Sequence, residues 1–599
     1  MASLSTTSPP STTTTSGIAT STTSLSPSLH KTSQISIIQK RINKHRLPRR
    51  LSCKANNNDR HDLNPTNDVA SNPKIDRRNV LLGLGGLSSL AGLRADPFAS
   101  AAPIAPPDLS KCGAADSAAF VESLNCCPPF SAQIVDFKPP PTSRVRVRPP
   151  AHAVDSAYTA KFNRAVQLMK ALPDSDPRSF KHQASVHCAY CDGAYEQVGF
   201  PNLDIQVHGS WLFFPFHRWY LYFFERILGK LINDPNFAMP FWNWDAPAGM
   251  QLPAIYTNTR SPLYDQFRNK RHLPPALVDL DFNGVDESIS NQAQIQANLT
   301  ILYRQMVSNS RSTSGFLGQP YRAGDNPQGS GSIENIPHGP VHVWTGDNTQ
   351  PNGENMGNFF SAGRDPLFYA HHSNVDRLWN VWKTLGGRRQ DYTDPDFLDT
   401  AFLFYDENSQ LVRVKVRDCL DSRKLGYVYQ DVDVPWLNSR PTPRRAVNRV
   451  TGFLERIGVA RADEFPRVSF PLTLDKPVKT LVSRPKKKRS KKEKDEEDEV
   501  LVIQGIEFDS NVPIKFDVFI NDEDDAPTGP DKSEFAGSFV SVPHKHKSEK
   551  KLNTCLRLDL TELLEDLDAE DDENVVVTLV PKIGTGHFSI GDLKIEFVS

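Results

Sequence analysis

The chain has 599 residues, with 69 Lys and Arg against 70 Asp and Glu, so its formal net charge is −1. A chain of this length can bury several domain cores of roughly 100–200 residues each, which excludes a small protein held together by disulfides alone. The balanced charge excludes a global basic field for nucleic acid or an anionic membrane, so no nucleic-acid partner is expected.

The first 101 residues have the composition of a targeting segment. Ser and Thr make up 21 of the first 40 residues, and the first acidic residue is Asp59. The pair Arg77-Arg78 precedes the apolar stretch Val80–Leu93, whose 14 residues are fewer than the ~20 that span a bilayer. Ala99-Ser100-Ala101 then resembles a cleavage signal, with cleavage after Ala101. We expect a two-part chloroplast and thylakoid transit peptide over 1–101, delivery to the thylakoid lumen and no stable membrane insertion, with a disordered tail as the alternative.

Residues 102–440 are predicted to form a mainly α-helical domain with long loops. Apolar residues recur at intervals of three and four in Gly209–Lys230 and in Asp365–Lys383, which predicts a helix in each. Frequent Pro and Gly residues elsewhere, as in Gly315–Gly331, are typical of loops. The Pro- and Arg-rich sequence that follows predicts a linker over 441–465.

From 466 to 599 the pattern changes to short β-type runs separated by polar turns, which predicts a β-sandwich. The predicted strands are Val500–Phe508, Ile514–Asn521, Phe535–Val542, Leu556–Leu560, Asn574–Val580 and Phe588–Val598. Arg484–Glu499 is basic in its first half and acidic in its second. A basic run can act as a nuclear-localisation or nucleic-acid segment, but the adjoining acids neutralise this one, so we expect a solvated, mobile loop.

Nine of the 16 histidines lie within residues 182–372, and six of these form two groups with structured spacing. The groups are His187, His208 and His217, and His338, His342 and His372. His338 and His342 are four residues apart and share one face of a helix, and His372 on another helix can complete a trio. A buried imidazole in an aromatic-rich stretch needs a partner, and a metal ion is a good one. The two trios therefore predict two metal sites.

The ligand type favours copper, with zinc second. Mg, Ca and Mn ions prefer oxygen ligands, and di-iron bundles use Glu-x-x-His pairs that the sequence lacks. The His-Glu-x-x-His motif of zinc hydrolases is also absent. A lone histidine is more often a packed core or surface residue, so it is the joint spacing that indicates ligands.

Five stretches closely resemble plant polyphenol oxidases, the catechol oxidase and tyrosinase family with a type-3 dicopper site. They are His187-Cys188, His208–Arg226, Phe241–Asp245, His338–His342 and Asp365–Arg377. The resemblance extends over nearly the whole chain, through Asp433–Leu437 and Lys515–Val518. It implies a dicopper tyrosinase-type catalytic domain at 102–440, a helix bundle around the metals, and a β-rich latency domain at 466–599 that shields the site.

The same resemblance implies two copper ions and a role for each matching residue. CuA is expected on His187, His208 and His217, and CuB on His338, His342 and His372. His371 is expected outside the ligand set. Asp376 is expected to accept a hydrogen bond from a ligand imidazole, with a surface pairing to Arg377 as the alternative. Glu334 is expected to hold a water molecule, unless it is a solvated loop acid, and Phe359 is expected to act as a gate.

The family pattern also assigns most of the cysteines. It implies the disulfides Cys112–Cys127 and Cys126–Cys188, and a thioether bond between Cys191 and His208. Cys419 and Cys555 then remain as reduced, buried thiols. Taken alone, Cys188-Ala-Tyr-Cys191 suggests a redox motif or half a zinc site, but no second C-x-x-C pair exists to complete a Cys₄ site.

In function, the resemblance implies a latent enzyme that oxidises o-diphenols to o-quinones and reduces O₂ to water. The expected partners are small phenolic substrates, O₂ and an activating protease. Gly339 stands where relatives that hydroxylate monophenols often have Asn, so weak monophenol hydroxylation is expected. An aurone-forming biosynthetic oxidase shares every motif. A hemocyanin-like oxygen carrier shares the histidine scheme, but the plastid signal and the plant-type C-terminal region argue against it.

Overall fold

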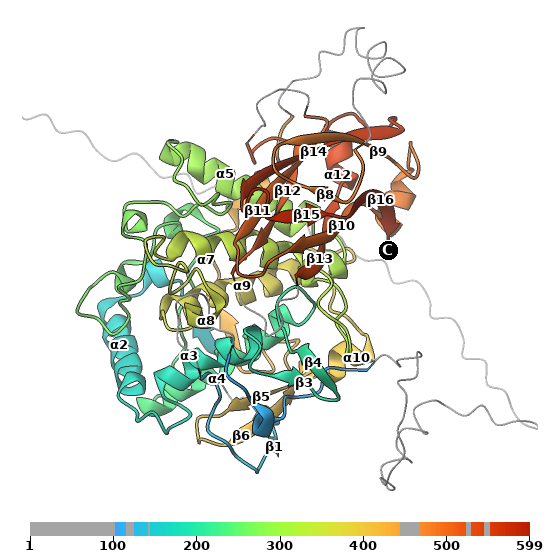
Figure 1. Ribbon diagram of the computed structural model, residues 1–599. Helices are drawn as coiled ribbons and strands as arrows, with labels where there is room; N and C mark the ends of the chain where they lie inside the picture. Colours follow the sequence, from blue (N-terminus) through green and yellow to red (C-terminus); the bar gives the residue numbers. More distant parts are fainter. Residues whose placement is uncertain (1–101, 116–124, 142–143, 444–467, 523–528, 544–550) are drawn as a thin grey trace, which may run out of the picture. The chain divides into compact units, whose positions relative to one another are not determined.

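Figure 1 shows the computed structural model, which describes residues 102–115, 125–141, 144–443, 468–522, 529–543 and 551–599. The expected targeting segment 1–101 and residues 444–465 of the expected linker lie outside these ranges. Within the described ranges, no helix is long and apolar enough to cross a membrane.

Residues 102–443, the helical region, consist mainly of helices and long loops (Figure 1). The helices are α2 (Ser156–Lys170), α3 (Phe180–Cys191), α4 (Phe213–Leu231), α5 (Asn291–Tyr303), α6 (Thr313–Leu317), α7 (Gly339–Thr345), α8 (Phe359–Ala362), α9 (Leu367–Thr384) and α10 (Pro395–Asp399). Two π-type turns, η6 (Arg304–Ser308) and η7 (Glu334–His338), follow α5 and precede α7.

Helix α4 is the centre of the helical region, because its side chains are buried on nearly all sides. A helix that is apolar all round belongs inside a core rather than on a surface. It begins later than the predicted Gly209–Lys230, because Gly209 has a φ of 70° and turns the chain before Phe213. Helix α9 packs against α4 and closely matches the predicted helix Asp365–Lys383.

Short strands pair around these helices. A sheet of order β1-β6-β5 and the pairs β2-β7 and β3-β4 are formed by β1 (Val135–Asp136), β2 (Arg146–Arg148), β3 (Glu196–Gln197), β4 (Phe200–Asp204), β5 (Ala401–Tyr405), β6 (Leu411–Lys415) and β7 (Tyr427–Tyr429). The parallel pairings β1-β6 and β2-β7 join the start of the helical region to its end.

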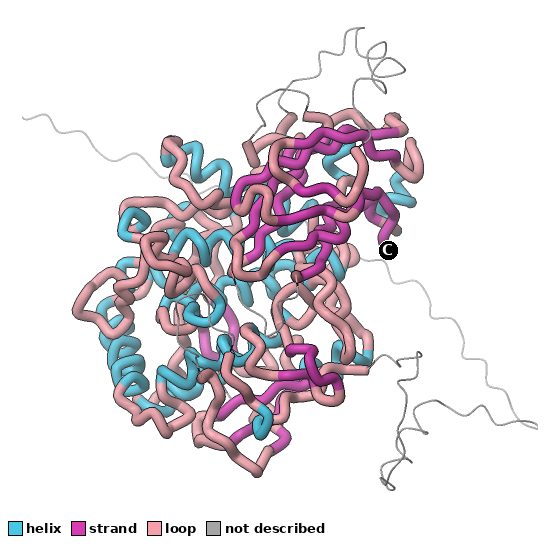
Figure 2. Tube along the Cα trace, in the orientation of Figure 1, coloured by secondary structure: helices cyan, strands magenta, loops and turns pink. Residues whose placement is uncertain are grey.

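Residues 468–599, the β region, form the predicted β-sandwich, whose strands are magenta in Figure 2. One sheet has the order β13-β10-β15-β8 with β16 also on β10, and the other has the order β12-β11-β14-β9. The strands are β8 (Leu472–Thr473), β9 (Val478–Ser483), β10 (Asp498–Phe508), β11 (Ile514–Ile520), β12 (Phe535–Ser541), β13 (Leu552–Asp559), β14 (Asn574–Ile583), β15 (Phe588–Ile590) and β16 (Asp592–Val598). Alternate residues of both sheets share one apolar core, and α12 (Thr561–Asp566) packs beside it.

The charged segment Arg484–Glu499 is more ordered than a solvated loop. It contains helix α11 (Lys491–Glu496), which Ser490 and Glu493 start with a capping box. The side chain of Arg484 is buried against Glu499, with Nε 2.7 Å from the carboxylate. The loop prediction was therefore wrong in part, because the charges pair with one another and with the sandwich.

The β region contacts the helical region through β12, which packs on η7 and α7. A buried ion cluster lies at the same contact, where Lys515 Nζ is 3.0 Å from Asp281 and 2.9 Å from Asp517. Tyr303 donates a 2.8 Å hydrogen bond to Glu562 elsewhere in this contact.

Candidate metal centre

The structure gathers seven buried histidines into two groups. The ligand-capable atoms within each group lie within 4.8 Å of one another. One group is His187 on α3, His208 on the loop before α4, and His217 on α4; the other is His338 in η7, His342 on α7, and His371 and His372 on α9. The rings of His217 and His372 stack with centroids 4.2 Å apart, so the two groups adjoin.

Backbone carbonyls fix the tautomer of four of these histidines. The Nδ1 atoms lie 2.8–2.9 Å from carbonyl oxygens: His187 from Phe359, His217 from Phe213, His338 from Glu334, and His342 from Met356. A carbonyl oxygen only accepts, so each Nδ1 carries the hydrogen and each Nε2 presents its lone pair. This is the arrangement that metal-binding imidazoles use.

The side chain of Gln206 accepts the Nδ1 hydrogen of His208 and so fixes its tautomer. Its Oε1 lies 3.1 Å from Nδ1 of His208, while its Nε2 donates a 2.9 Å hydrogen bond to the carbonyl of Cys191. The amide is therefore oriented with its oxygen toward the imidazole, and it connects helix α3 to the loop that carries His208.

His371 has the opposite arrangement. Trp244 donates its indole N–H to Nδ1 of His371 over 3.1 Å, so the neutral ring carries its hydrogen on Nε2. A protonated Nε2 has no lone pair for a metal. His372, by contrast, directs its Nε2 toward Nε2 of His342 at 3.2 Å. The bond from Trp244 thus sets His371 apart from its neighbour, whose Nε2 faces a member of the same histidine group.

The donor set suits a metal that prefers imidazole. The Nε2 atoms of His187, His217 and His338 are buried and have no hydrogen-bond partner in the part of the chain that the structure describes. Burial lowers the pKa of His187 to about 3 and that of His342 to about 4, so both rings are neutral at physiological pH. Neutral imidazoles with buried, unused lone pairs fit copper or zinc far better than magnesium or calcium.

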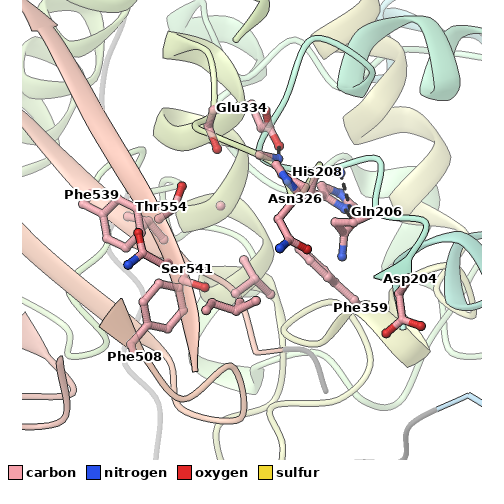
Figure 3. Close-up of a pocket in the computed structure, with 18 of the residues that line it drawn as sticks. Asp204, Gln206, His208, Asn326, Glu334, Phe359, Phe508, Phe539, Ser541 and Thr554 are labelled. Carbon is pink, nitrogen blue, oxygen red and sulfur yellow. Dashed lines mark hydrogen bonds between the residues drawn. The ribbon is translucent and has the colours of Figure 1, made fainter. Parts of the chain in front are cut away.

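Phe359 and Glu334 border the same centre (Figure 3). The ring of Phe359 stacks on His208 with centroids 4.1 Å apart. The carboxylate of Glu334 accepts a hydrogen bond from the Gly209 N–H at 2.5 Å, and burial raises its pKa to about 8. Glu334 is 5% exposed, so it is not a solvated loop acid.

A cavity of ≈ 230 Å³ leads from these residues to the β region. His208, Glu334, His338 and Phe359 line one side, and Phe508, Phe539, Val540 and Thr554 line the other. A Cβ atom added at Gly339 would lie 3.0 Å from Cγ1 of Val540. Strand β12 therefore packs directly over the residue that follows His338.

The cysteines form the two expected disulfides, Cys112–Cys127 and Cys126–Cys188. The second joins the N-terminal arm to α3, next to His187. Cys191 and Cys419 are buried and outside any disulfide, while Cys555 is only partly buried. Gln206 hydrogen-bonds both to the backbone carbonyl of Cys191 and to the imidazole of His208.

The prediction that Asp376 accepts a hydrogen bond from a ligand imidazole was wrong. Within the described ranges, the Asp376 carboxylate accepts no hydrogen bond from an imidazole. It accepts hydrogen bonds from Arg218 (2.5 Å), Tyr427 (2.6 Å), Tyr429 and Arg148. The alternative of a surface pair with Arg377 is also wrong, because Asp376 is 3% exposed and Arg377 pairs with Asp245. Asp376 instead ties α9 to α4 through Arg218, the residue after His217.

The residues that orient the imidazoles were not among the predicted site residues. Trp244 lies within the stretch Phe241–Asp245 and Gln206 lies two residues before His208, but residue type alone does not say which ring each contacts. The carbonyls of Met356 and Phe359 carry no sequence signal, because every residue has one.

A helical core that presents two adjoining groups of buried imidazoles defines a protein with an all-histidine dinuclear metal centre. Family models match the chain in three places: the common central domain of tyrosinase at 177–385, the polyphenol oxidase middle domain at 391–442, and the chloroplastic polyphenol oxidase C-terminal domain at 470–597. The chain belongs to the tyrosinase family, among the plant polyphenol oxidases. Its cofactor is a pair of copper ions.

Individual proteins that are similar to this chain belong to the same family. A chloroplastic polyphenol oxidase from Malus domestica is 62% identical over 583 residues, which are 96% of each chain. The structure of latent apple tyrosinase is 65% identical, with a TM-score of 0.74, and the match covers 78% of this chain and all of that one. A latent aurone synthase from natural source is 46% identical, with a TM-score of 0.77, over 83% of this chain and 99% of that one.

Proposed function

We propose that the chain is a latent polyphenol oxidase that oxidises o-diphenols to o-quinones while O₂ is reduced to water. The observation that carries the proposal is the pair of adjoining imidazole groups that open into a cavity lined with aromatic rings. When bound, the copper pair supplies the electron transfer between the phenol and O₂. The protein supplies five imidazoles whose Nε2 lone pairs are freed by a bond at Nδ1, the imidazole of His372 beside them, and an apolar cavity that suits a phenolic ring.

In this proposal His187, His208 and His217 bind CuA, and His338, His342 and His372 bind CuB. The tautomer of His371 supports leaving it outside the set. Phe359 forms a wall over His208, and Glu334 holds a water molecule at the cavity. A thioether between Cys191 and His208 would fix that ring further; a crosslinked peptide joining the two residues in mass spectrometry would establish it.

The proposed substrate preference is diphenol oxidation with weak monophenol hydroxylation, supported by Gly339. Oxygen uptake with 4-methylcatechol against tyramine tests this preference. A tyramine rate comparable to the catechol rate, with a short lag, would contradict it. The likeness to a latent aurone synthase favours a specialised biosynthetic oxidase as a second candidate, and uptake with a chalcone against 4-methylcatechol separates the two.

The β region is proposed to hold the enzyme latent. Its strand β12 stands over the cavity, and the apple relative is described as latent. We place the catalytic domain at 102–440, the linker at 441–465 and the latency domain at 466–599, with a protease that cuts between the last two. Activity of the full chain that is the same before limited proteolysis and after the cleaved β region has been removed would overturn this arrangement.

The proposed location is the chloroplast, and within it the thylakoid lumen. The Malus relative is named chloroplastic, and the two-part signal over 1–101 supports the lumen. Import of the full chain into isolated chloroplasts, followed by fractionation, tests both steps; product that stays in the stroma would contradict the lumen.

A further inference from the structure

Asn335 joins the metal centre to the β region. It follows Glu334 in η7, three residues before His338, and is 7% exposed. Its Oδ1 accepts a 2.9 Å hydrogen bond from the Val540 N–H, and its Nδ2 donates to the carbonyl of Ser538. The carboxamide thus pairs with a strand backbone as a neighbouring peptide group would.

The position of β12 in its sheet explains the pairing. β12 is at one end of the order β12-β11-β14-β9, so only one of its edges is bonded to another strand. An edge strand presents a row of backbone donors and acceptors that need partners. Asn335 satisfies one donor and one acceptor of that row, at the point where β12 passes the cavity.

The segment that Asn335 belongs to orients one histidine group. The carbonyl of Glu334 accepts the hydrogen of Nδ1 of His338 at 2.9 Å, and the carboxylate of Glu334 binds the Gly209 N–H. A shift of η7 would therefore move both an imidazole and the acid beside it. Figure 3 shows Glu334 and His208 facing Phe539 and Ser541 of β12 across the cavity.

The same end of β12 reaches the other group. The carbonyl of Pro543, two residues after β12, accepts a 3.4 Å hydrogen bond from the Phe359 N–H. The carbonyl of Phe359 in turn accepts the Nδ1 hydrogen of His187. One stretch of the β region is thus bonded to two segments that each hold an imidazole.

We propose that Asn335 is a positioning residue through which the β region steadies the metal centre as well as shielding it. The inference rests on the proposed role of His338 as a copper ligand. It predicts that the latent protein retains copper more firmly when Asn335 is bonded to β12.

The test is copper release from the full-length holoenzyme to a chelator, compared between wild type and Asn335→Ala. We expect one of the two copper ions to leave about threefold to tenfold faster in the variant, a smaller effect than the roughly 10–100-fold loss of metal affinity or activity typical when a direct partner of a ligand imidazole is removed. Asn335→Asp keeps the acceptor for Val540 but loses the donor to Ser538, so it should fall between them.

Tyr303→Phe is the matched control. It removes the 2.8 Å hydrogen bond to Glu562, another contact between the two regions, and among the described residues Tyr303 makes no hydrogen bond or ring contact with the histidines. Its copper release should equal that of wild type. If Tyr303→Phe releases copper as fast as Asn335→Ala, loosening of the contact in general is responsible and the inference is overturned.

Hydrogen exchange at the Val540 amide is the second measurement, and it serves for any variant that retains the fold. Faster exchange together with faster copper release supports the inference; faster exchange with unchanged release overturns it. A chain that binds two coppers and oxidises 4-methylcatechol, yet shows no effect of Asn335, rejects the inference alone. A chain that binds no copper rejects the proposed function.

Discussion

The ring of Phe359 lies face to face with the imidazole of His208, with centroids 4.1 Å apart and planes inclined by 16°. The backbone of the same residue holds His187 through its carbonyl. One residue therefore touches two members of the first histidine group, with its side chain on one and its main chain on the other.

Phe359→Ala separates these two roles, because it removes the ring and keeps the carbonyl. We expect the unfolding free energy to fall by about 3 kcal/mol, as for other buried aromatic truncations, with copper content unchanged. The widened cavity should raise kcat/KM for bulky catechols relative to 4-methylcatechol in the activated enzyme. Phe359→Leu is the control and should show a smaller shift; equal ratios in all three enzymes would contradict the role of the ring as a wall.

His371→Ala and His372→Ala form a matched pair of neighbours. The first should retain two coppers per chain, because Nε2 of His371 carries a hydrogen in the arrangement fixed by Trp244. The second should lose one copper and the oxidase activity. Metal analysis after gel filtration measures both; loss of copper in His371→Ala would refute the tautomer argument.

Asp376→Ala should unfold at lower denaturant without losing copper. The variant leaves the buried guanidinium groups of Arg148 and Arg218 without their shared carboxylate, and breaking one side of such a buried cluster typically costs about 3–5 kcal/mol. Denaturant unfolding and metal analysis together decide. If copper is lost while stability is kept, Asp376 acts on an imidazole after all.

Asp281 should make stability depend on pH. Burial, with Asp517 nearby, raises the pKa of Asp281 to about 7 despite the attraction of Lys515. The folded protein therefore holds this proton more tightly than the unfolded chain, whose Asp pKa is about 3.9. The stability from this group is fully present below the unfolded pKa and is lost as pH rises through about 7.

Unfolding midpoints at pH 5, 6, 7 and 8 for wild type and Asp281→Asn measure this dependence. The midpoint of wild type should fall relative to that of the variant as pH rises from 5 to 8. Parallel curves across this range would show that Asp281 does not titrate there.

Gly339→Ala tests how closely the β region packs on the centre. The added Cβ would lie 3.0 Å from Val540, and overpacking of this kind costs about 1 kcal/mol or more. The uncut variant should therefore oxidise 4-methylcatechol about fivefold faster than uncut wild type. After proteolysis and removal of the β region the two enzymes should have equal activity, and Val540→Ala in the same uncut chain should restore latency. Unchanged latency in Gly339→Ala would mean that β12 yields without leaving its place.

Sequence patterns were enough for the main elements around the centre. The periodicity of Asp365–Lys383 predicted α9 closely, because Trp379 and Trp382 repeat at the spacing that buries one face. The β runs located most of the sandwich, but β8 and β9 were missed. β8 has only two residues, and β9, Val478–Ser483, becomes a strand through its pairing with β14, which is remote in sequence.

The spacing in the sequence also predicted the six histidines as candidate ligands, but it could not predict how their rings are oriented. Which ring nitrogen is free depends on carbonyls of Met356 and Phe359 and on side chains such as Gln206, and these depend on the folded backbone. The error over Asp376 has the same origin. An acid four residues after His372 is well placed in a helix, yet Arg218 and Tyr427 from other elements reach it first.

The two disulfides lie entirely within residues 112–188, and Cys419 and Cys555 take no part in any among the described residues. Disulfides therefore bind the N-terminal arm to the helical region, whereas no disulfide among the described residues joins that region to the sandwich. A cut in the main-chain connection between the two alters connectivity but leaves Lys515, Glu562 and Asn335 in their contacts. Cleavage of the connection and dissociation of the β region are thus separate events. A cleaved molecule stays inactive as a complex of two chains until dilution, an amphiphile or a substrate displaces the β region.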